Sequence, residues 1–279
     1  MAIRVLVPLD GSDYSKVATD IAVKIVKKMG GVVVGLGVID VDDIEDSVIG
    51  AGVGASYYAE RLGEFKINDA IEKVKNFLNE FEKVCKDAKV NYEKYSKSGD
   101  PVEEIIEMGR TSDLIITGLR TFFHFETTPE PGETLQVLLK ESVCPVFAVP
   151  RKLENLNKTA LIAYDGTTHS AKAMKSFSRF AYASDIVDKV YLLNVNDDIE
   201  EANTLLNAAE KYLKTHEFEV EKIRKVGKPR DVILEQAVEN KVFVVVMGAY
   251  GRSGISNLFF GHSSLKIIEE DRIPIFVFH

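Results

Sequence analysis

The sequence has few cysteines and no cluster of metal-binding residues. Its 279 residues include only two cysteines, Cys85 and Cys144, which lie far apart and form no C-x-x-C pair. Histidines do not cluster at metal-ligand spacing either. The pattern therefore excludes a disulfide framework and a zinc site, and it fits a reducing compartment. We expect a cytoplasmic protein without a resident metal.

Positive charge and long apolar runs are also scarce. The 35 lysines and arginines are outnumbered by 43 aspartates and glutamates, which gives a net charge of −8. Nucleic acids and anionic membranes attract basic surfaces, so this balance argues against both partners. No run approaches the ~18 apolar residues of a transmembrane helix, and residues 1–10 lack the features of a signal peptide. The expected partners are small molecules and proteins.

The chain repeats itself in four landmarks that occur in the same order. The matched segments are 3–12 with 159–168, 99–106 with 227–234, 112–118 with 243–248, and 143–149 with 273–278. With 46% hydrophobic residues, the chain can bury two cores. We predict two copies of one domain, at 1–150 and 159–279, joined by the polar linker 151–158.

Short apolar runs alternate with helical periodicity in each copy. Runs such as 3–9 and 113–117 are continuous, which is typical of strands covered on both faces, whereas 18–29 has apolar residues at helical spacing. Right-handed crossovers then favour an open parallel α/β sheet with helices on both faces. The strands predicted for the second copy are 160–163, 189–195, 219–225, 242–247 and 274–278.

The first copy carries additional residues near 40–66. They include G-A-G-V-G at 50–54, but an acidic run at 40–46 precedes these glycines. The glycines also do not link a strand directly to a helix, as a dinucleotide-binding fingerprint requires. We expect a mobile surface insertion here.

Polar residues at strand ends indicate where a ligand would bind. Ligands of open parallel sheets bind outside the carboxyl ends of the strands, where the strand order reverses. In the second copy, Asp165 ends the first strand and Val195 ends the second. The Asp165 carboxylate could accept hydrogen bonds from a ribose hydroxyl or an adenine amine. It could equally cap the following helix, and the sequence leaves both interpretations open.

A glycine-rich loop at 247–264 follows the fourth strand of this copy. Glycines let backbone N–H groups approach a polyphosphate, and the helix expected at 263–270 would offer its N-terminus. The residues that would serve a phosphate chain are Gly248, Gly251, Arg252, Gly261, Ser263 and Ser264. The alternative is that the glycines only turn the chain and Ser263 caps the helix.

The spacing G-x-x-G, nine residues, then G resembles the ATP-binding signature of the universal stress protein family. The strand-end aspartate, the G-x-P before the third helix and the final apolar strand extend the resemblance over essentially the whole chain, twice. It implies a Rossmann-like, adenine nucleotide alpha hydrolase-like fold, with five parallel strands in the order 3-2-1-4-5 in each copy. It also implies that the copies pack as a pseudo-dimer, and a homodimer of whole chains is a further expectation.

The resemblance places ATP, ADP or AMP in the second copy, with Mg²⁺ expected to accompany the nucleotide. The adenine and ribose would contact Ala163, Asp165 and Val195. The phosphates would contact Met247, Gly248, Gly251, Gly261, His262, Ser263 and Ser264. His262 departs from the family, which usually has Ser or Thr after the third glycine, although an imidazole at a helix N-terminus could still donate to phosphate.

The corresponding loop of the first copy departs further. Thr121 stands at the second glycine position, and Glu133 stands where the hydroxyl belongs. Because a carboxylate close to a triphosphate is electrostatically unfavourable, we predict that this copy binds ATP poorly or not at all. The adenine side retains Pro8, Asp10 and Val38.

These expectations favour a nucleotide-binding regulatory or stress-response protein read by an unidentified protein partner. A slow ATP hydrolase, or a phosphoryl or nucleotidyl transferase, is an alternative. It is disfavoured because no lysine follows the glycines as G-K-[S/T], and we assign no catalytic residue. A nucleotide-free interaction scaffold is the second alternative.

Overall fold

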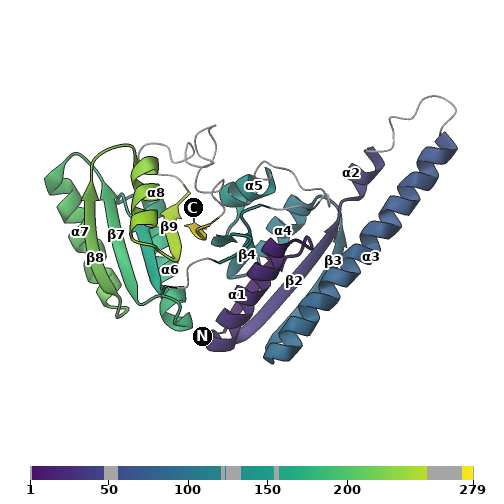
Figure 1. Ribbon diagram of the computed structural model, residues 1–279, viewed down its shortest axis with the longest axis horizontal. Coiled ribbons are helices and arrows are strands. Elements are labelled where there is room, and N and C mark those ends of the chain that lie inside the picture. The colour runs from purple at the N-terminus through teal and green to yellow at the C-terminus, as the bar shows by residue number, and fades with distance from the viewer. Residues whose placement is uncertain are drawn as a thin grey trace.

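The computed structural model describes residues 2–46, 56–120, 123, 133–153, 157–249 and 272–278. One sheet runs through this part of the chain, with helices on both faces (Figure 1). The strands are β1 (Ile3–Pro8), β2 (Gly31–Ile39), β3 (Asn91–Ser98), β4 (Leu114–Gly118), β5 (Val146–Val149), β6 (Thr159–Ala163), β7 (Lys189–Val195), β8 (Glu219–Lys225), β9 (Val244–Gly248) and β10 (Ile275–Phe278). Their order in the sheet is β3-β2-β1-β4-β5-β10-β9-β6-β7-β8.

The helices of the described ranges pack in two layers against this sheet. They are α1 (Asp13–Met29), α2 (Val41–Asp46), α3 (Ser56–Ala88), α4 (Pro101–Gly109), α5 (Glu133–Glu141), α6 (Thr168–Ser184), α7 (Ile199–Lys214) and α8 (Pro229–Glu239). The core beneath α1, α3, α6 and α7 is separate from the core beneath α4, α5 and α8. None of these helices combines the length and apolar character needed to cross a bilayer.

Each half of the sheet has the strand order that the sequence predicts. β1 and β6 lie centrally in their halves, and within each half all neighbouring strands are parallel. The orders β3-β2-β1-β4-β5 and β8-β7-β6-β9-β10 both correspond to 3-2-1-4-5, so the predicted fold class is confirmed. Ligands of this fold class bind at the carboxyl ends of the central strands, so each half has one such edge to examine.

The two halves join edge to edge through β5 and β10. These strands run antiparallel, with Phe147 directly opposite Phe276 and 6.1 Å between their ring centroids. Phe177 and Phe180 of α6 pack on Phe276, and Phe243 packs on Phe147. Each of the two cores contains residues from both halves. The junction is thus a hydrophobic seam, not a flexible connection between separate units.

Side-chain caps fix the start of several helices at the carboxyl edge of the sheet. Ser12 and Thr167 accept backbone hydrogen bonds at the starts of α1 and α6. Asp100 and Asp198 do the same for α4 and α7. Because an N-cap satisfies otherwise unpaired N–H groups, these residues set the loops that surround the candidate site.

The additional residues of the first half are largely helical where the structure describes them. α3 has 33 residues, whereas its counterpart α7 has 16. Residues 56–66, part of the insertion that the sequence predicts, form the first turns of α3. Buried residues at helical spacing hold the rest of this helix on the sheet, namely Ala70, Val74, Leu78, Phe81 and Cys85. Leu62 and Phe65 remain exposed on the early turns, and residues 50–54 lie outside the described ranges.

An equivalent trio of charged residues ties an outer helix to the edge strand in each half. The two trios are Glu82–Lys86–Lys94 and Glu210–Lys214–Lys222. Lys86 and Lys214 follow the glutamates by one helical turn, at 2.7 and 2.8 Å. Hydrogen bonds from these lysines, with those from Lys94 and Lys222 of the edge strands, lower the pKa of both glutamates to about 2.

Candidate functional site

The second half has an open pocket at the carboxyl edge of the sheet. It has a volume of 440 Å³ and extends from the ends of β6 and β7 to the turn between β8 and α8. Ala163, Asp165 and Val195, which the sequence assigns to one site, all line it. The other described residues that line it are Tyr164, Leu193, Asn194, Asn196, Asp197, Val226, Gly227, Pro229 and Ile233.

Asp165 supports the cap of α6 but is not itself the cap. Its Oδ1 accepts hydrogen bonds from the backbone N–H of Thr167 at 3.0 Å and from the Thr167 hydroxyl at 2.7 Å. Thr167 in turn accepts from the backbone N–H of Ser170. The interpretation that Asp165 caps the helix is thus replaced by an indirect role, which the structure combines with a position in the pocket wall.

Asn194 links the carboxyl ends of β6 and β7 at the pocket. It is 2% exposed, and its Nδ2 donates to the backbone carbonyl of Tyr164 at 2.7 Å. This bond ties the end of β7 to the residue that follows β6. Burial, with a smaller contribution from the neighbouring Asp165, raises the pKa of Tyr164, so this phenol is neutral at pH 7.

Apolar side chains form another part of the described pocket wall. Val195 ends β7, Ile233 lies on α8, and Val226 precedes the Gly227–Pro229 turn. Val226 is 60% exposed. A flat apolar ligand group placed here would remove this surface from water.

Gly248 has a structural reason to be glycine, apart from any ligand. A Cβ atom at this position would lie 2.6 Å from the backbone of His169 and Ser170 at the start of α6. Gly118 in the first half is equally confined, because a Cβ atom there would lie 2.6 Å from that of Tyr14. Substituting Gly248 therefore perturbs packing, and it does not isolate phosphate binding. The Met247 side chain is fully buried as well, which leaves only its backbone for a ligand.

The remaining residues assigned to phosphate lie outside the described ranges. They are Gly251, Arg252, Gly261, His262, Ser263 and Ser264. Their role stays a prediction from the sequence. Among the described residues, no group of three or more His, Cys, Asp or Glu side chains is placed to hold a metal ion.

The equivalent residues of the first half are buried. Asp10 is 7% exposed, Val38 is 1% exposed, and Pro8 is buried too. Val38 belongs to the same core cluster as Leu119 and Phe123, which follow β4. Of the adenine side that the sequence retains in this half, Val38 belongs to the hydrophobic core, and Pro8 and Asp10 are buried.

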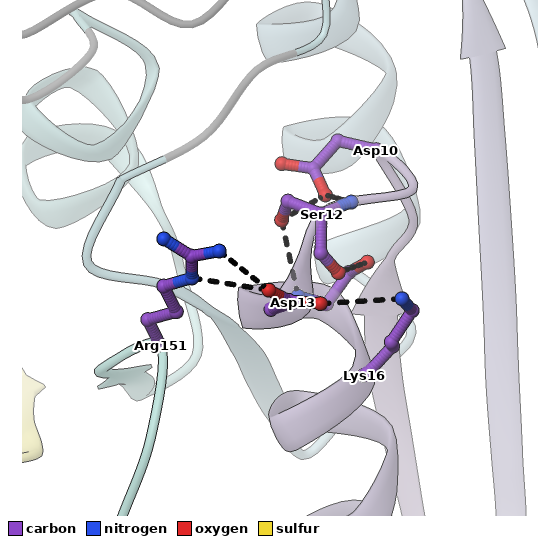
Figure 2. A network of polar contacts seen from close by, with 6 residues as sticks. Asp10, Ser12, Asp13, Lys16 and Arg151 are labelled. Carbon is purple, nitrogen blue, oxygen red and sulfur yellow. Dashed lines mark hydrogen bonds and ion pairs between the residues drawn. The ribbon is translucent and has the colours of Figure 1, made fainter.

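A polar network occupies the start of α1 beside this buried position (Figure 2). Asp10 accepts from the backbone and hydroxyl of Ser12, as Asp165 does from Thr167. Arg151, just after β5, donates to Asp13 through Nε at 3.0 Å and Nη2 at 2.9 Å. Arg151, together with Lys16, holds the pKa of Asp13 below its ordinary value. The network fastens the chain leaving the first half to its first helix.

Sequence reasoning missed much of the described pocket wall. The G-x-P pattern at Gly227 and Pro229, which repeats in the two halves, is a signal that could indicate the turn at this end of the pocket. Asn194, Asp197 and Val226 gave no comparable signal, because each is an ordinary residue near a strand end.

Comparisons with known proteins give matches that cover nearly the whole chain. The sequence model that matches is that of the universal stress protein family, over residues 1–150 and 157–279. Universal stress protein Slr1230 of Synechocystis sp. is 22% identical over 287 residues, covering 99% of this chain and 99% of that protein. A universal stress protein from Archaeoglobus fulgidus gives a TM-score of 0.70 at 22% identity, covering 98% of this chain and 97% of the other. A functionally unknown protein from Pseudomonas aeruginosa PAO1 gives 0.60 at 14%, covering 99% and 92%.

Proposed function

The chain belongs to the universal stress protein family, and from this premise we propose that it binds an adenine nucleotide in the pocket of its C-terminal half. The nucleotide is ATP, ADP or AMP, with Mg²⁺ accompanying a polyphosphate. Bound nucleotide would bias the joined halves toward a conformation that a protein partner recognises in a stress response. A homodimer of whole chains would be a further level of assembly.

The pocket itself carries this proposal. Its 440 Å³ lies within the ~300–1,000 Å³ typical of small-molecule sites. Val195, Val226 and Ile233 offer aliphatic surface to a base, while Asp165 offers a carboxylate to the ribose hydroxyls. The phosphates would extend toward the glycine-rich loop after β9, whose sequence suits backbone contacts to anions.

We further propose that each chain binds one nucleotide. The residues that would receive adenine in the first half are buried, and Val38 shares a core cluster with Leu119 and Phe123. Opening that position would expose core side chains to water, which adds to the electrostatic argument from Glu133. Titration calorimetry should give a stoichiometry near one, and two sites per chain would contradict this part of the proposal.

The first experiment combines mass spectrometry of the purified protein with calorimetric titration of AMP and ATP. Val226→Asp places a charge on the apolar wall without disturbing the core, since Val226 is exposed. We expect AMP affinity to fall at least about tenfold, because the base would cover an uncompensated carboxylate. Val143→Asp, at a 59% exposed valine of the first half, is the matched control and should bind AMP normally.

The outcome also separates the alternatives. Unchanged AMP affinity in Val226→Asp would show that the nucleotide does not occupy this pocket. No co-purified nucleotide together with no titratable binding would favour the scaffold. Steady-state ATP turnover by the wild-type chain would favour the slow hydrolase.

A further inference from the structure

The described wall of the C-terminal pocket carries two carboxylates and no cation. Asp165 follows β6 and Asp197 follows β7. Tyr164, the third ionisable group of this wall, is a neutral phenol at pH 7, and burial raises its pKa further. The end of a ligand that enters here therefore meets negative charge, which favours hydroxyl and amine donors over anionic groups.

Asp197 takes no part in the hydrogen bonds that shape the turn between β7 and α7. Asn196 accepts the backbone N–H of Asp198 at 3.0 Å, and its Nδ2 donates to Glu201 at 2.9 Å. Asp198 caps α7 through the backbone N–H groups of its first turn. Within the described ranges, the Asp197 side chain makes no hydrogen bond or ion pair, and it is exposed at the pocket.

The counterpart of Asp197 in the first half has a different role. Asp40 follows β2 as Asp197 follows β7, but it is only 8% exposed. Its Oδ1 accepts the backbone N–H of Asp43 at 3.1 Å, in the first turn of α2. In the first half Asp40 therefore holds the start of α2, whereas in the second half Asp197 lines the open pocket.

We propose that Asp197 selects nucleotides with free ribose hydroxyls and rejects those that carry an additional phosphate on the ribose. This inference rests on the proposed function. A hydroxyl can donate to a carboxylate, whereas a phosphate monoester brings up to two negative charges into a wall that already holds two. The ligand class is a nucleotide whose negative charge lies entirely at its 5′ end.

Three cationic residues near the pocket lead to the opposite expectation, that a phosphate on the ribose strengthens binding. Lys225 and Arg230 flank the Gly227–Pro229 turn and Lys228 lies within it, but none of them lines the pocket. If one of them received a ribose phosphate, nucleotides with that phosphate would bind more tightly than AMP. The direction of the preference therefore distinguishes a carboxylate-controlled pocket from a lysine-controlled one.

The test compares AMP with adenosine 2′,5′-bisphosphate and adenosine 3′,5′-bisphosphate by calorimetry on the full chain. We expect both bisphosphates to bind at least tenfold more weakly than AMP. Asp197→Asn should reduce this ratio at least threefold, because it removes one of the two charges. Glu200→Gln makes the same charge change outside the described pocket wall and should leave the ratio unchanged.

Each result bears on a different claim. Bisphosphates that bind as tightly as AMP, or a ratio unaffected by Asp197→Asn, would overturn the selectivity while leaving nucleotide binding intact. If neither AMP nor ATP binds, the proposed function fails, and the selectivity fails with it. Circular dichroism of Asp197→Asn should match the wild type, since this side chain makes no hydrogen bond or ion pair within the described ranges.

Discussion

At the scale of single residues, two aspartates show how one local motif serves fold and site together. Asp10 and Asp165 each hold the residue two positions later, Ser12 or Thr167, which caps the next helix. Only Asp165 also lines an open pocket. The sequence located both aspartates but could not choose between capping and binding, because burial decides and the D-G-S/T pattern does not encode burial.

Alanine at these two positions should separate the two roles. Asp10→Ala and Asp165→Ala should each lower the free energy of unfolding by ~0.5–2 kcal/mol, the usual range for a weakened N-cap. Only Asp165→Ala should also reduce AMP affinity, by about tenfold, through loss of a charged hydrogen-bond acceptor. Urea denaturation and calorimetry measure both quantities. An equal loss of AMP affinity in Asp10→Ala would place a ligand in the first half.

At the scale of elements, the sequence predicts the strands well but does not predict the length of α3. The predicted strands at 189–195 and 219–225 coincide with β7 and β8. α3 differs, since Leu62 and Phe65 on its early turns are exposed, whereas buried residues recur at helical spacing from Ala70 onward. Its length follows from continuation of a helix already anchored on β2 and β3, which local sequence does not reveal.

The paired glutamates of the outer helices predict how stability responds to acid. The pKa values of Glu82 and Glu210 are lowered to about 2 in the folded state, from ordinary values near 4.5. Their contribution is therefore fully present above about pH 4.5, and it is lost as the pH falls toward 2. The double variant with Glu82→Gln and Glu210→Gln should be less stable than the wild type at pH 7, and the difference should disappear near pH 2.

Urea midpoints measured from pH 7 to pH 2 would follow this difference. Glu72→Gln, which removes an exposed i,i+3 pair with Lys75, is the control and should change the midpoint little. Parallel curves for the double variant and the wild type over the whole range would contradict the assigned pKa values.

At the scale of the whole molecule, the repeat predicted two similar halves but not the contact that joins them. The strands V-F-A-V and I-F-V-F are apolar along their whole length and suit any buried neighbour. Whether the two halves join through these edge strands or through their helices depends on how well the whole surfaces of the halves fit each other. The boundary at 151–158 remains a prediction, and so does the phosphate loop, whose residues lie outside the described ranges.

The aromatic seam should contribute strongly to the stability of both halves. Phe276 is fully buried among Phe147, Phe177 and Phe180, so Phe276→Ala should cost ~3–5 kcal/mol through lost contacts and a cavity. Scanning calorimetry should show a lower midpoint and separate transitions for the two halves. Phe65→Ala, at a side chain 69% exposed, should have little effect. A single transition at the wild-type midpoint for Phe276→Ala would show that the seam contributes little.

The pairing of β5 with β10 also governs how the two halves can diverge. In an assembly of identical subunits, every substitution appears at each site, and dilution separates the partners. Here both halves lie in one chain, so their contact does not depend on protein concentration, and a substitution in one site leaves the other unaltered. Evolution could therefore fill the first pocket with core side chains while the second stayed open, with the shared sheet intact throughout.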